Sequence, residues 1–342
     1  MKVVHIESGL GNQMLSYSEY LVLKKLHPEQ DIYIETLVFD IPECNDVICQ
    51  WNGYELRNIF GIDAPNVRDF LAEGQWDIVE DYVRKSKFWE DNWDYPHVYV
   101  EAFEKAGISL KNQRGSTYWM PQKSLKATIT NNRLGYDVKR WLRPFYAERY
   151  IEKLSTRDKI FDESNDDTFT GQFLGLMHKK SGIEFVEDEI RAAFAFPEFT
   201  DNQNLEMKRN LENSNSVAIH ARRGDMLHSN GYCYKYGYFK RATSFIKKNV
   251  ENPLFVFFCD PESVEWSKKN LKIFGLDIEK DRIQFADWNK GTESYKDMQL
   301  MGCCKHNIIT FSSFGWWGTF FNQNPNKITC SPNVYINTTH TF

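Results

Sequence analysis

The chain has 342 residues, of which 42% are hydrophobic and 26% are charged. This length and this balance are typical of a soluble globular protein with two ordinary domains. The 47 acidic residues outnumber the 42 basic ones, which gives a net charge of −5. That charge excludes a global basic surface for nucleic acid, so any recognition of phosphate must be local.

The cysteines and the amino terminus bear on the compartment. The seven cysteines show no spacing typical of a zinc site, which indicates free thiols in a reducing environment. A strand pattern begins at Lys2, without the apolar segment of a signal peptide. No apolar run approaches the ~20 residues that span a bilayer. We therefore expect a cytoplasmic protein.

The chain begins with the pattern of a doubly wound domain. Lys2–Ile6 is typical of a strand, and the glycine-containing segment Ser8–Met14 is typical of a turn into a helix that ends near Leu26. Asp31–Glu35 predicts a second strand. The turn either brings backbone amides close to a ligand or simply connects strand and helix, and both interpretations stay open.

The region from Val38 to Tyr150 lacks a clean period. It contains six tryptophans among charged and polar residues, namely Trp51, Trp76, Trp89, Trp93, Trp119 and Trp141. We interpret it as helices and loops that elaborate the first domain. The tryptophans either pack a loop-rich core, which is favoured, or form a sugar-binding surface. Arg140–Leu154 and Glu184–Phe196 each have a helical pattern.

Strands and helices alternate regularly in the second half. The predicted strands are Val217–Ile219, Leu254–Phe258, Arg282–Ala286, Asn307–Phe311 and Lys327–Cys330, and the predicted helices are Tyr238–Val250, Pro261–Phe274 and Ser294–Cys304. This alternation predicts a parallel sheet of Rossmann type. We therefore predict an α/β protein with two domains, 1–200 and 201–342, whose ligand-binding residues follow the carboxyl ends of the strands.

The segment His220–Asp225, which reads His-Ala-Arg-Arg-Gly-Asp, is the leading candidate for a ligand site. Guanidinium groups match phosphate oxygens in geometry and stay charged at working pH. By itself the segment is equally compatible with a solvated turn that contains an ion pair. Its place after a buried strand of a predicted parallel sheet favours a nucleotide diphosphate as the ligand.

Several motifs resemble those of the fucosyltransferase superfamily. His220–Asp225 resembles its His-x-Arg-Arg-x-Asp signature. Gly9–Met14 is similar to the amino-terminal Gly-Leu-Gly-Asn-Gln-Met of the α-1,2 branch, glycosyltransferase family eleven. Ser312–Gly318 resembles that branch's Ser-x-Phe-Ser-Trp-Trp-Gly, and Asp297–Ile309 fits the pattern that precedes it approximately. The motifs occur in the family's order and extend over nearly the whole chain, so together they are specific.

The resemblance implies a bacterial enzyme of GT-B type, with two Rossmann-like domains facing across a cleft. Such an enzyme transfers fucose from GDP-fucose to a galactose-terminated glycan, with inversion, without a metal and, we expect, with an α-1,2 linkage. Its partners would be the nucleotide sugar and an oligosaccharide acceptor, with no cofactor and no nucleic acid. It would work in the cytoplasm or peripherally at the inner membrane. Two rivals stay open: a GT-B transferase with another nucleotide sugar or linkage, and a catalytically silent glycan- or nucleotide-binding protein.

The resemblance also assigns roles to individual residues. The expected catalytic residues are Arg222 on the β-phosphate, His220 beside it and Asp225, which orients the turn. The expected donor-binding residues are Arg222, Arg223, Asp297, Ser312, Ser313 and Phe314, of which Asp297 reads guanine or ribose. Asn12 and Gln13 are expected on the acceptor side. No metal ligand is expected.

The general base is not designated by the sequence. Glu7, His228 and Asp225 are the candidates, although a strongly dissociative transition state would need little help from a base.

The chain departs from the family pattern at three places. Glu7-Ser8 replaces a pair that is often rich in glycine, Thr170–Phe173 stands where the family has Gly-Tyr-Trp-Gln, and Gly315 replaces a serine. We expect Trp316 and Trp317 to pack a helix start onto the sheet rather than to contact sugar.

Overall fold

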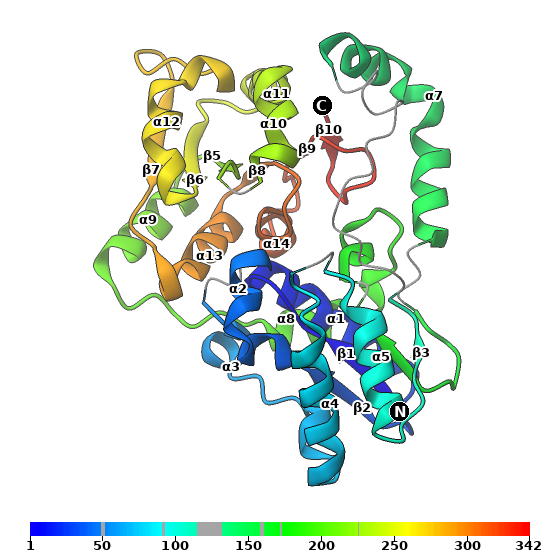
Figure 1. Cartoon of the computed structure of the whole chain (residues 1–342). Helices are drawn as coiled ribbons and strands as arrows, with labels where there is room; N and C mark the ends of the chain where they lie inside the picture. Colours follow the sequence, from blue (N-terminus) through cyan, green and yellow to red (C-terminus); the bar gives the residue numbers. More distant parts are fainter. Residues whose placement is uncertain (49–51, 91–92, 115–131, 158–160, 172, 225) are drawn as a thin grey trace. The chain divides into compact units, whose positions relative to one another are not determined.

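The computed structural model describes residues 1–48, 52–90, 93–114, 132–157, 161–171, 173–224 and 226–342. The chain divides into two compact units (Figure 1). The first comprises Met1–Lys123, Ser155–Leu176 and Lys180–Pro197, and the second comprises Ser124–Leu154, Met177–Lys179 and Glu198–Phe342. The last crossing between them falls at Pro197–Glu198, and segment 124–154 belongs to the second unit although it lies in the first half of the chain.

The first unit is built on a parallel four-stranded sheet in the order β2-β1-β4-β3. Its strands are β1 (Lys2–His5), β2 (Ile32–Glu35), β3 (Lys111–Asn112) and β4 (Thr168–Thr170). Its helices are α1 (Leu10–Leu26), α2 (Pro42–Ile48), α3 (Glu55–Phe60), α4 (Glu73–Ser86), α5 (Tyr95–Lys105) and α8 (Glu187–Ala193). The opening strand, helix and strand that the sequence predicts are confirmed.

The second unit contains a parallel six-stranded sheet in the order β10-β9-β8-β5-β6-β7. Its strands are β5 (Ser216–Ala221), β6 (Leu254–Cys259), β7 (Arg282–Ala286), β8 (His306–Ile309), β9 (Thr329–Ser331) and β10 (His340–Thr341). Its helices are α7 (Arg133–Arg157, of which the residues from Ser155 on are assigned to the first unit), α9 (Asn202–Glu212), α10 (Leu227–Lys235), α11 (Tyr238–Asn249), α12 (Val264–Lys269), α13 (Tyr295–Cys303) and α14 (Ser313–Phe321). The expected α/β fold with two Rossmann-like units is confirmed, and their arrangement across a cleft stays a prediction.

Two predicted helices differ from the expectation. The segment Glu184–Phe196 contains a 3₁₀ turn, Ile183–Val186, and the shorter helix α8, Glu187–Ala193. The segment Pro261–Phe274 was expected to form one helix, but it forms α12 between two short 3₁₀ turns. The last turn ends at Gly275, whose φ of 73° lies in the left-handed region that favours glycine.

The alternation of side chains along β5 positions the candidate site. Val217 and Ile219 belong to the core that this sheet forms with α11, where Tyr238 and Phe239 are also buried. Figure 1 shows α10 and α11 on one side of the sheet and α13 and α14 on the other. Because successive residues of a strand point to opposite faces, His220 lies on the side of α14.

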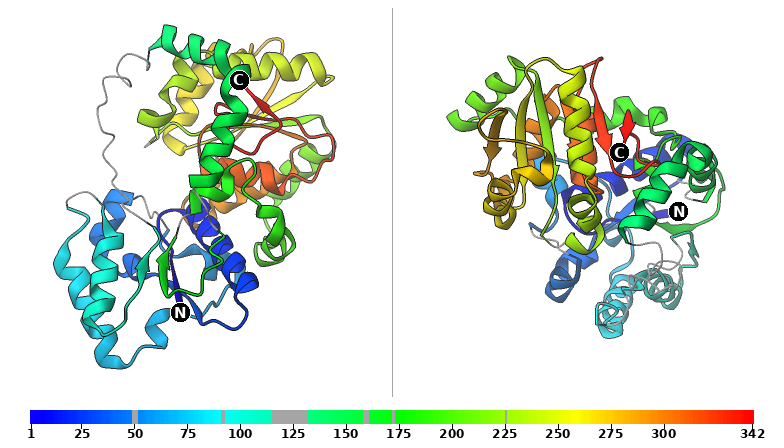
Figure 2. Two further views of the ribbon diagram at one scale, coloured as in Figure 1. Left: turned by 90° about the vertical axis from the view of Figure 1, so that its right-hand side faces the viewer. Right: turned by 90° about the horizontal axis from the view of Figure 1, so that it is seen from above.

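Helix α7 packs along the carboxyl-terminal strand of the second unit. The hydroxyl of Tyr136 donates to the carbonyl of Phe342 at 3.3 Å, and Nη1 of Arg143 donates to the carbonyl of Thr341 at 2.5 Å. Both views in Figure 2 accordingly show the C-terminus beside this helix. The helix predicted at Arg140–Leu154 is confirmed, and it begins earlier, at Arg133. None of the described helices combines the length and the apolar character needed to cross a membrane.

The tryptophans mostly pack the interior. Trp76 and Trp93 are buried in the core of the first unit, and Trp89 packs against it. Trp316 and Trp317 are buried at the start of α14, as expected. Trp141 is the exception, because 72% of it is exposed on α7. Trp51 and Trp119 lie outside the described residues.

Candidate active site

The turn after β5 is held in place by a carboxylate from the neighbouring strand. Asp260 follows β6, which pairs with β5, so both strands end at the same edge of the sheet. Its Oδ2 accepts hydrogen bonds from the backbone amides of Arg223 at 2.8 Å and Gly224 at 3.0 Å. Its Oδ1 lies 2.8 Å from Nη1 of Arg222. Asp225, which was expected to orient this turn, lies outside the described residues.

The two arginines of the turn have different surroundings. The Arg222 guanidinium is only 16% exposed and is paired with Asp260. The Arg223 guanidinium lies 3.9 Å from the centre of the Trp266 ring, on α12. Stacking of this kind stabilises a cation without using its hydrogen-bond donors. Asp260 therefore holds Arg222 in place, whereas Arg223 braces the turn against α12.

His220 contacts the start of α14. Its ring stacks on Phe314 with centroids 5.6 Å apart, and a Cβ at Gly315 would lie 2.5 Å from its Nδ1. That Nδ1 is buried and has no hydrogen-bond partner among the described residues. Burial, together with the charge of Arg222, lowers the pKa of His220 to about 4. At neutral pH His220 is therefore an uncharged packing partner of α14.

Asn230 connects the arginine turn to the start of α14. Its Nδ2 donates to the carbonyls of Arg222 at 3.4 Å and Phe311 at 3.3 Å, and its Oδ1 accepts from the amide of Phe311 at 3.1 Å. Ser312 is the N-cap of α14, and Ser313 is its first residue. The first amides of a helix point outward and carry partial positive charge. The structure therefore brings the guanidinium of Arg222 and an anion-attracting helix start to one edge of the sheet.

The sequence assigns no site role to Asn230. Asp260 lies two residues after the predicted strand Leu254–Phe258, which places it at the sheet edge where ligand-binding residues are expected, although it was given no individual role. Asn230 lies inside α10 with no local signal.

Asp297 is held by a polar network at the start of α13. Its Oδ1 accepts from Nδ2 of Asn289 at 2.7 Å, and Asn289 exchanges two hydrogen bonds with Asn204. Trp288 donates its Nε1–H to the same Asn204 at 3.0 Å. Burial raises the pKa of Asp297 to about 7, and the nearby carboxylate of Asp287 adds to this effect. Asp297 therefore presents a positioned carboxyl group that changes charge near neutral pH.

In the first unit, Asn12 and Gln13 lie in the first turn of α1 and have different surroundings. Asn12 is half-buried and its Nδ2 donates to Oγ of Ser8 at 3.1 Å. Gln13 is fully buried. Its Nε2 donates to the carbonyl of Gly53 at 2.8 Å, and its Oε1 accepts from the backbone amide of Glu55 at 2.9 Å. Ser8 has a φ of 67°, a region that suits the glycine common in the family pattern. Gln13 thus positions segment 53–55, and Asn12 is the member of the pair at the surface.

Glu7, one of the base candidates, belongs to a buried network. It accepts hydrogen bonds from Nε1 of Trp93 at 2.9 Å and from the hydroxyl of Tyr95 at 3.2 Å. Although burial favours its protonated form, His5 keeps the pKa of Glu7 below its usual value. These contacts give Glu7 a structural function and make it a weak proton acceptor. His228, another candidate, is exposed in the first turn of α10.

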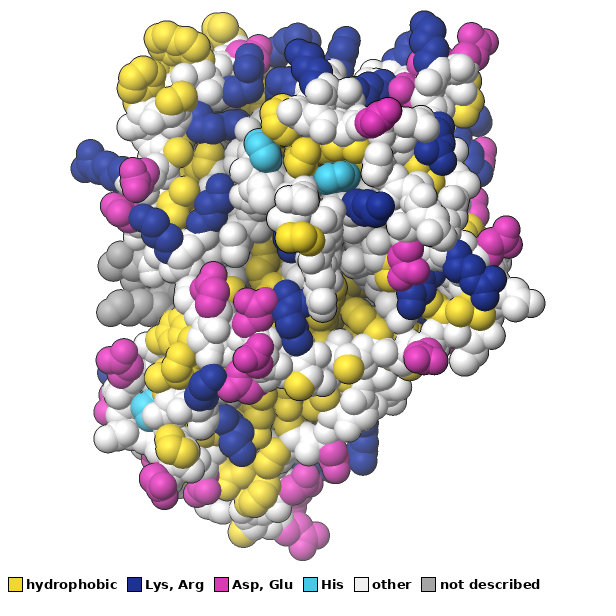
Figure 3. Space-filling model, turned by 180° about the vertical axis from the view of Figure 1, so that it is seen from behind, with side chains coloured by type: hydrophobic (Ala, Val, Ile, Leu, Met, Phe, Trp, Pro, Cys, Tyr) yellow, Lys and Arg dark blue, Asp and Glu magenta, His cyan; other side chains and the backbone are white. Residues whose placement is uncertain are grey.

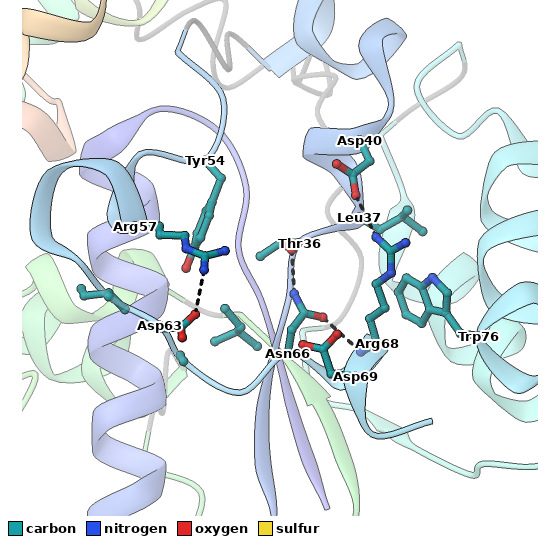
Figure 4. Close-up of a pocket in the computed structure, with 13 residues that line it drawn as sticks. Thr36, Leu37, Asp40, Tyr54, Arg57, Asp63, Asn66, Arg68, Asp69 and Trp76 are labelled. Atoms are coloured by element: carbon teal, nitrogen blue, oxygen red, sulfur yellow. Dashed lines mark hydrogen bonds and ion pairs between the residues drawn. The ribbon is translucent and has the colours of Figure 1, made fainter. Parts of the chain in front are cut away.

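A polar pocket of about 240 Å³ lies beside the carboxyl end of β2 in the first unit (Figure 4). Tyr54 and Trp76 contribute aromatic surface, and two ion pairs, Arg57–Asp63 at 3.6 Å and Arg68–Asp40 at 3.7 Å, lie at its rim. Side chains with paired charges and aromatic faces can bind the hydroxyl groups and apolar faces of a sugar. Tyr54 is placed in the pocket by the segment that Gln13 anchors.

The described residues contain no group of three or more side chains arranged to hold a metal ion.

Comparisons with known proteins identify the family. The model of glycosyl transferase family 11 matches residues 118–340. An α-1,2-colitosyltransferase of Escherichia coli is 32% identical over 269 residues, which are 71% of this chain and 88% of that protein. Galactoside α-(1,2)-fucosyltransferase 1 of Saimiri sciureus is 25% identical over 147 residues, or 40% of this chain and 38% of that protein.

Among solved structures, fucosyltransferase NodZ from Bradyrhizobium covers 93% of this chain and 91% of its own, with 9% identity and a TM-score of 0.42. A likeness this weak carries no argument about function. The family match extends over more than half of the sequence. It includes the turn after β5, which carries Arg222, and the start of α14. The chain is a glycosyltransferase and belongs to glycosyl transferase family 11.

Proposed function

We propose that this enzyme transfers fucose from GDP-fucose to a galactose-terminated glycan, with inversion at the anomeric carbon and formation of an α-1,2 linkage. The observation that carries this proposal is the joint placement of Arg222 and the start of α14, which Asn230 connects. The named relatives that transfer fucose or colitose with α-1,2 specificity support the same reaction class.

The chemistry of the step explains why this arrangement suits it. Departure of GDP places negative charge on the β-phosphate oxygens while the sugar acquires oxocarbenium character. The Arg222 guanidinium, held by Asp260, and the amides at the start of α14 can stabilise that charge without reorganisation. Because these groups supply the positive charge, we propose that turnover does not require a divalent metal.

We assign recognition of the nucleobase to Asp297. Guanine presents two neighbouring N–H donors, and an ionised carboxylate can accept both. The hydrogen bond from Asn289 fixes one oxygen of Asp297 and thereby sets the orientation of its carboxyl group. Adenine and uracil lack this pair of donors, so the arrangement favours a guanine nucleotide.

We assign the acceptor to the first unit. Asn12, in the first turn of α1, and the pocket next to Tyr54 lie beyond the carboxyl ends of β1 and β2, where an α/β sheet binds its ligands. The hydroxyl, amide and charged groups that line this pocket suit an oligosaccharide. The identity of the general base stays open between His228 and Asp225, because Glu7 is engaged by Trp93 and Tyr95.

A second donor is favoured by one observation. The relative that is matched over 88% of its length is named a colitosyltransferase. Colitose is fucose without its 3-hydroxyl group, so the two sugars would differ by one polar contact. A site that hydrogen-bonds this hydroxyl would reject colitose strongly, whereas an apolar site would discriminate little.

The direct test is an assay with GDP-fucose and GDP-colitose in parallel, using a galactose-terminated oligosaccharide, in EDTA and with added Mg²⁺. NMR of the product gives the anomer and the linkage. We expect an α-1,2 product from GDP-fucose that forms equally well in EDTA. Exclusive use of GDP-colitose would mean that colitose, and not fucose, is the sugar that this enzyme transfers. An absolute requirement for a metal ion would contradict the proposed mechanism.

A further inference from the structure

The second unit has a groove between α9 and the end of β7. Its volume is about 510 Å³, which lies within the range of pockets that hold small molecules. It is lined by side chains between Gln203 and Asn213 on α9 and its C-cap, by Gln284 on β7 and by Trp288 beyond that strand. We refer to it as the α9 groove. None of the residues that hold the donor or the acceptor in the proposed function lines it.

Four amide side chains line the α9 groove, namely those of Gln203, Asn210, Asn213 and Gln284. Nδ2 of Asn210 donates to Oε1 of Gln284 at 2.8 Å, which connects the helix to the strand. Because an amide has two N–H donors and one carbonyl acceptor, this bond leaves the carbonyl of Asn210 and the amino group of Gln284 for a ligand. A donor next to an acceptor matches the hydroxyl groups of a sugar, which both donate and accept.

Trp288 adds an aromatic surface to the α9 groove. Its Nε1–H donates to Oδ1 of Asn204 at 3.0 Å, and Asn204 is buried. The indole is therefore held by its nitrogen edge, while the side chain is partly exposed where it lines the groove. The C–H groups on one face of a sugar ring are apolar. A fixed indole ring beside hydrogen-bonding amides therefore suits a saccharide.

The charges of the α9 groove do not favour an anion. Glu206 and Arg209 are both exposed and contribute one charge of each sign. In the view from behind, acidic and basic side chains are interspersed on the right, where α9 of Figure 1 lies (Figure 3). A phosphate or a carboxylate would instead require a local excess of positive charge. The groove therefore favours an uncharged polar ligand.

We propose that the α9 groove binds an uncharged saccharide, with Trp288 stacked on the apolar face of a sugar ring and with Asn210 and Gln284 bonded to its hydroxyl groups. Because none of the donor residues lines the groove, it would hold a part of a glycan that does not react. This proposal depends neither on which sugar the enzyme transfers nor on the pocket next to Tyr54.

The test is titration of the nitrogen-labelled full chain with lactose and with lacto-N-tetraose, followed by NMR. Asn204 connects Trp288 through Asn289 to Asp297, so each titration is made with and without GDP. We expect the indole N–H signal of Trp288, identified by its absence in Trp288→Phe, to shift saturably in both conditions. The signal of Trp141, which is 72% exposed on α7, should not shift.

Two variants measure the contributions to affinity, which is read from the backbone signals of α9. Trp288→Ala should lower the affinity about tenfold, since the stacking surface is lost. Asn210→Ala should lower it about fivefold through the loss of a hydrogen bond, and alanine preserves the helix. Trp141→Ala removes an exposed tryptophan outside the groove and is the matched control, which should bind like the unaltered protein.

Three results would overturn the proposal. The first is the absence of a saturable shift at Trp288. The second is an affinity in Trp288→Ala and Asn210→Ala equal to that in Trp141→Ala. The third is a shift that GDP abolishes, which would mean that the saccharide occupies the donor site.

Discussion

The imidazole of His220 fills the space that a side chain at residue 315 would need. A Cβ on Gly315 would lie 2.5 Å from Nδ1 of His220, which is closer than real contacts allow, and 3.0 Å from its Cγ, which is tighter than most. The family pattern that this segment resembles has a serine at that position. The glycine and the location of His220 therefore belong together, and they determine how closely β5 approaches the start of α14.

Gly315→Ala should accordingly displace the ring of His220 and destabilise the second unit. Overpacking of a well-filled interior costs about 1–3 kcal/mol. The same displacement should weaken the binding of GDP, since the start of α14 shifts with respect to Arg222. Thermal unfolding and calorimetric titration measure the two effects.

Gly231→Ala is the control for that substitution. Gly231 lies within α10, and a Cβ there would meet nothing within 4 Å. Alanine favours a helix over glycine by up to about 1 kcal/mol, so this variant should be neutral or stabilised. Similar losses in both variants would contradict the role given to the contact between His220 and Gly315.

Arg222→Ala should reduce turnover by roughly two to three orders of magnitude while the fold is retained. Arg222→Lys keeps the charge but loses the planar fork, so its loss should be intermediate. Arg149→Ala removes an exposed arginine outside the site and serves as the control. Measured kcat values that do not separate Arg222→Ala from Arg149→Ala would show that Arg222 does not act on the leaving group.

The affinity for GDP should increase as the pH rises through about 7. Burial holds the pKa of Asp297 near that value, so the carboxyl group is largely protonated at pH 6 and accepts from only part of the guanine edge. Above pH 7 it is ionised and accepts both donors. Titrations between pH 6 and pH 8 measure this trend.

The terminal phosphate of GDP also titrates in this range, so the informative quantity is the difference between the unaltered protein and Asp297→Asn. This variant should bind GDP more weakly at pH 8 and show a smaller dependence on pH. Parallel pH profiles would exclude Asp297 from nucleobase recognition.

The stability of the first unit should fall between pH 6.5 and about pH 9. Burial alone would lower the pKa of His5, but the carboxylates of Glu35 and Glu7 raise it to about 9. A raised folded-state pKa means that stability is fully present below the unfolded value of about 6.5 and is lost as the pH rises through the folded value. The change is on the order of 3 kcal/mol.

Glu35→Gln isolates this effect, because Nδ1 of His5 lies 2.5 Å from Oε2 of Glu35. The variant should be less stable at pH 6.5 and should lose little further stability at pH 9. Hydrogen exchange of the β1 amides, corrected for the intrinsic dependence on pH, reports on this unit directly. An equal slope in both proteins would mean that another group is responsible.

The second unit was largely predictable from the sequence because its signals are local. The apolar run at Leu254–Cys259 and the glycine- and proline-containing turns mark strands and helices without reference to the rest of the chain. The motif that begins at His220 starts in the last two residues of a strand that is buried throughout, so its place at the sheet edge could also be inferred.

Other features depend on contacts between distant segments. β4 consists of only Thr168–Thr170, yet it lies between β1 and β3 in the sheet. The chain reaches it after forming α7, most of which belongs to the other unit, and no local pattern indicates such a detour. Asn230 likewise gains its role only when α10 lies beside the turn after β5 and the segment before α14. Burial and register, rather than residue preference, determine these positions.

The most direct measurement is calorimetric titration of the full chain with GDP, ADP and UDP in EDTA, repeated with Arg222→Ala. Arg222 and the start of α14 are assigned to the diphosphate, and Asp297 is assigned to guanine. We therefore predict preferential binding of GDP, a large loss of affinity for it in Arg222→Ala, and no need for a metal ion. Equal affinity for the three nucleotides, or binding that Arg222→Ala does not change, would contradict the assignment of the donor site.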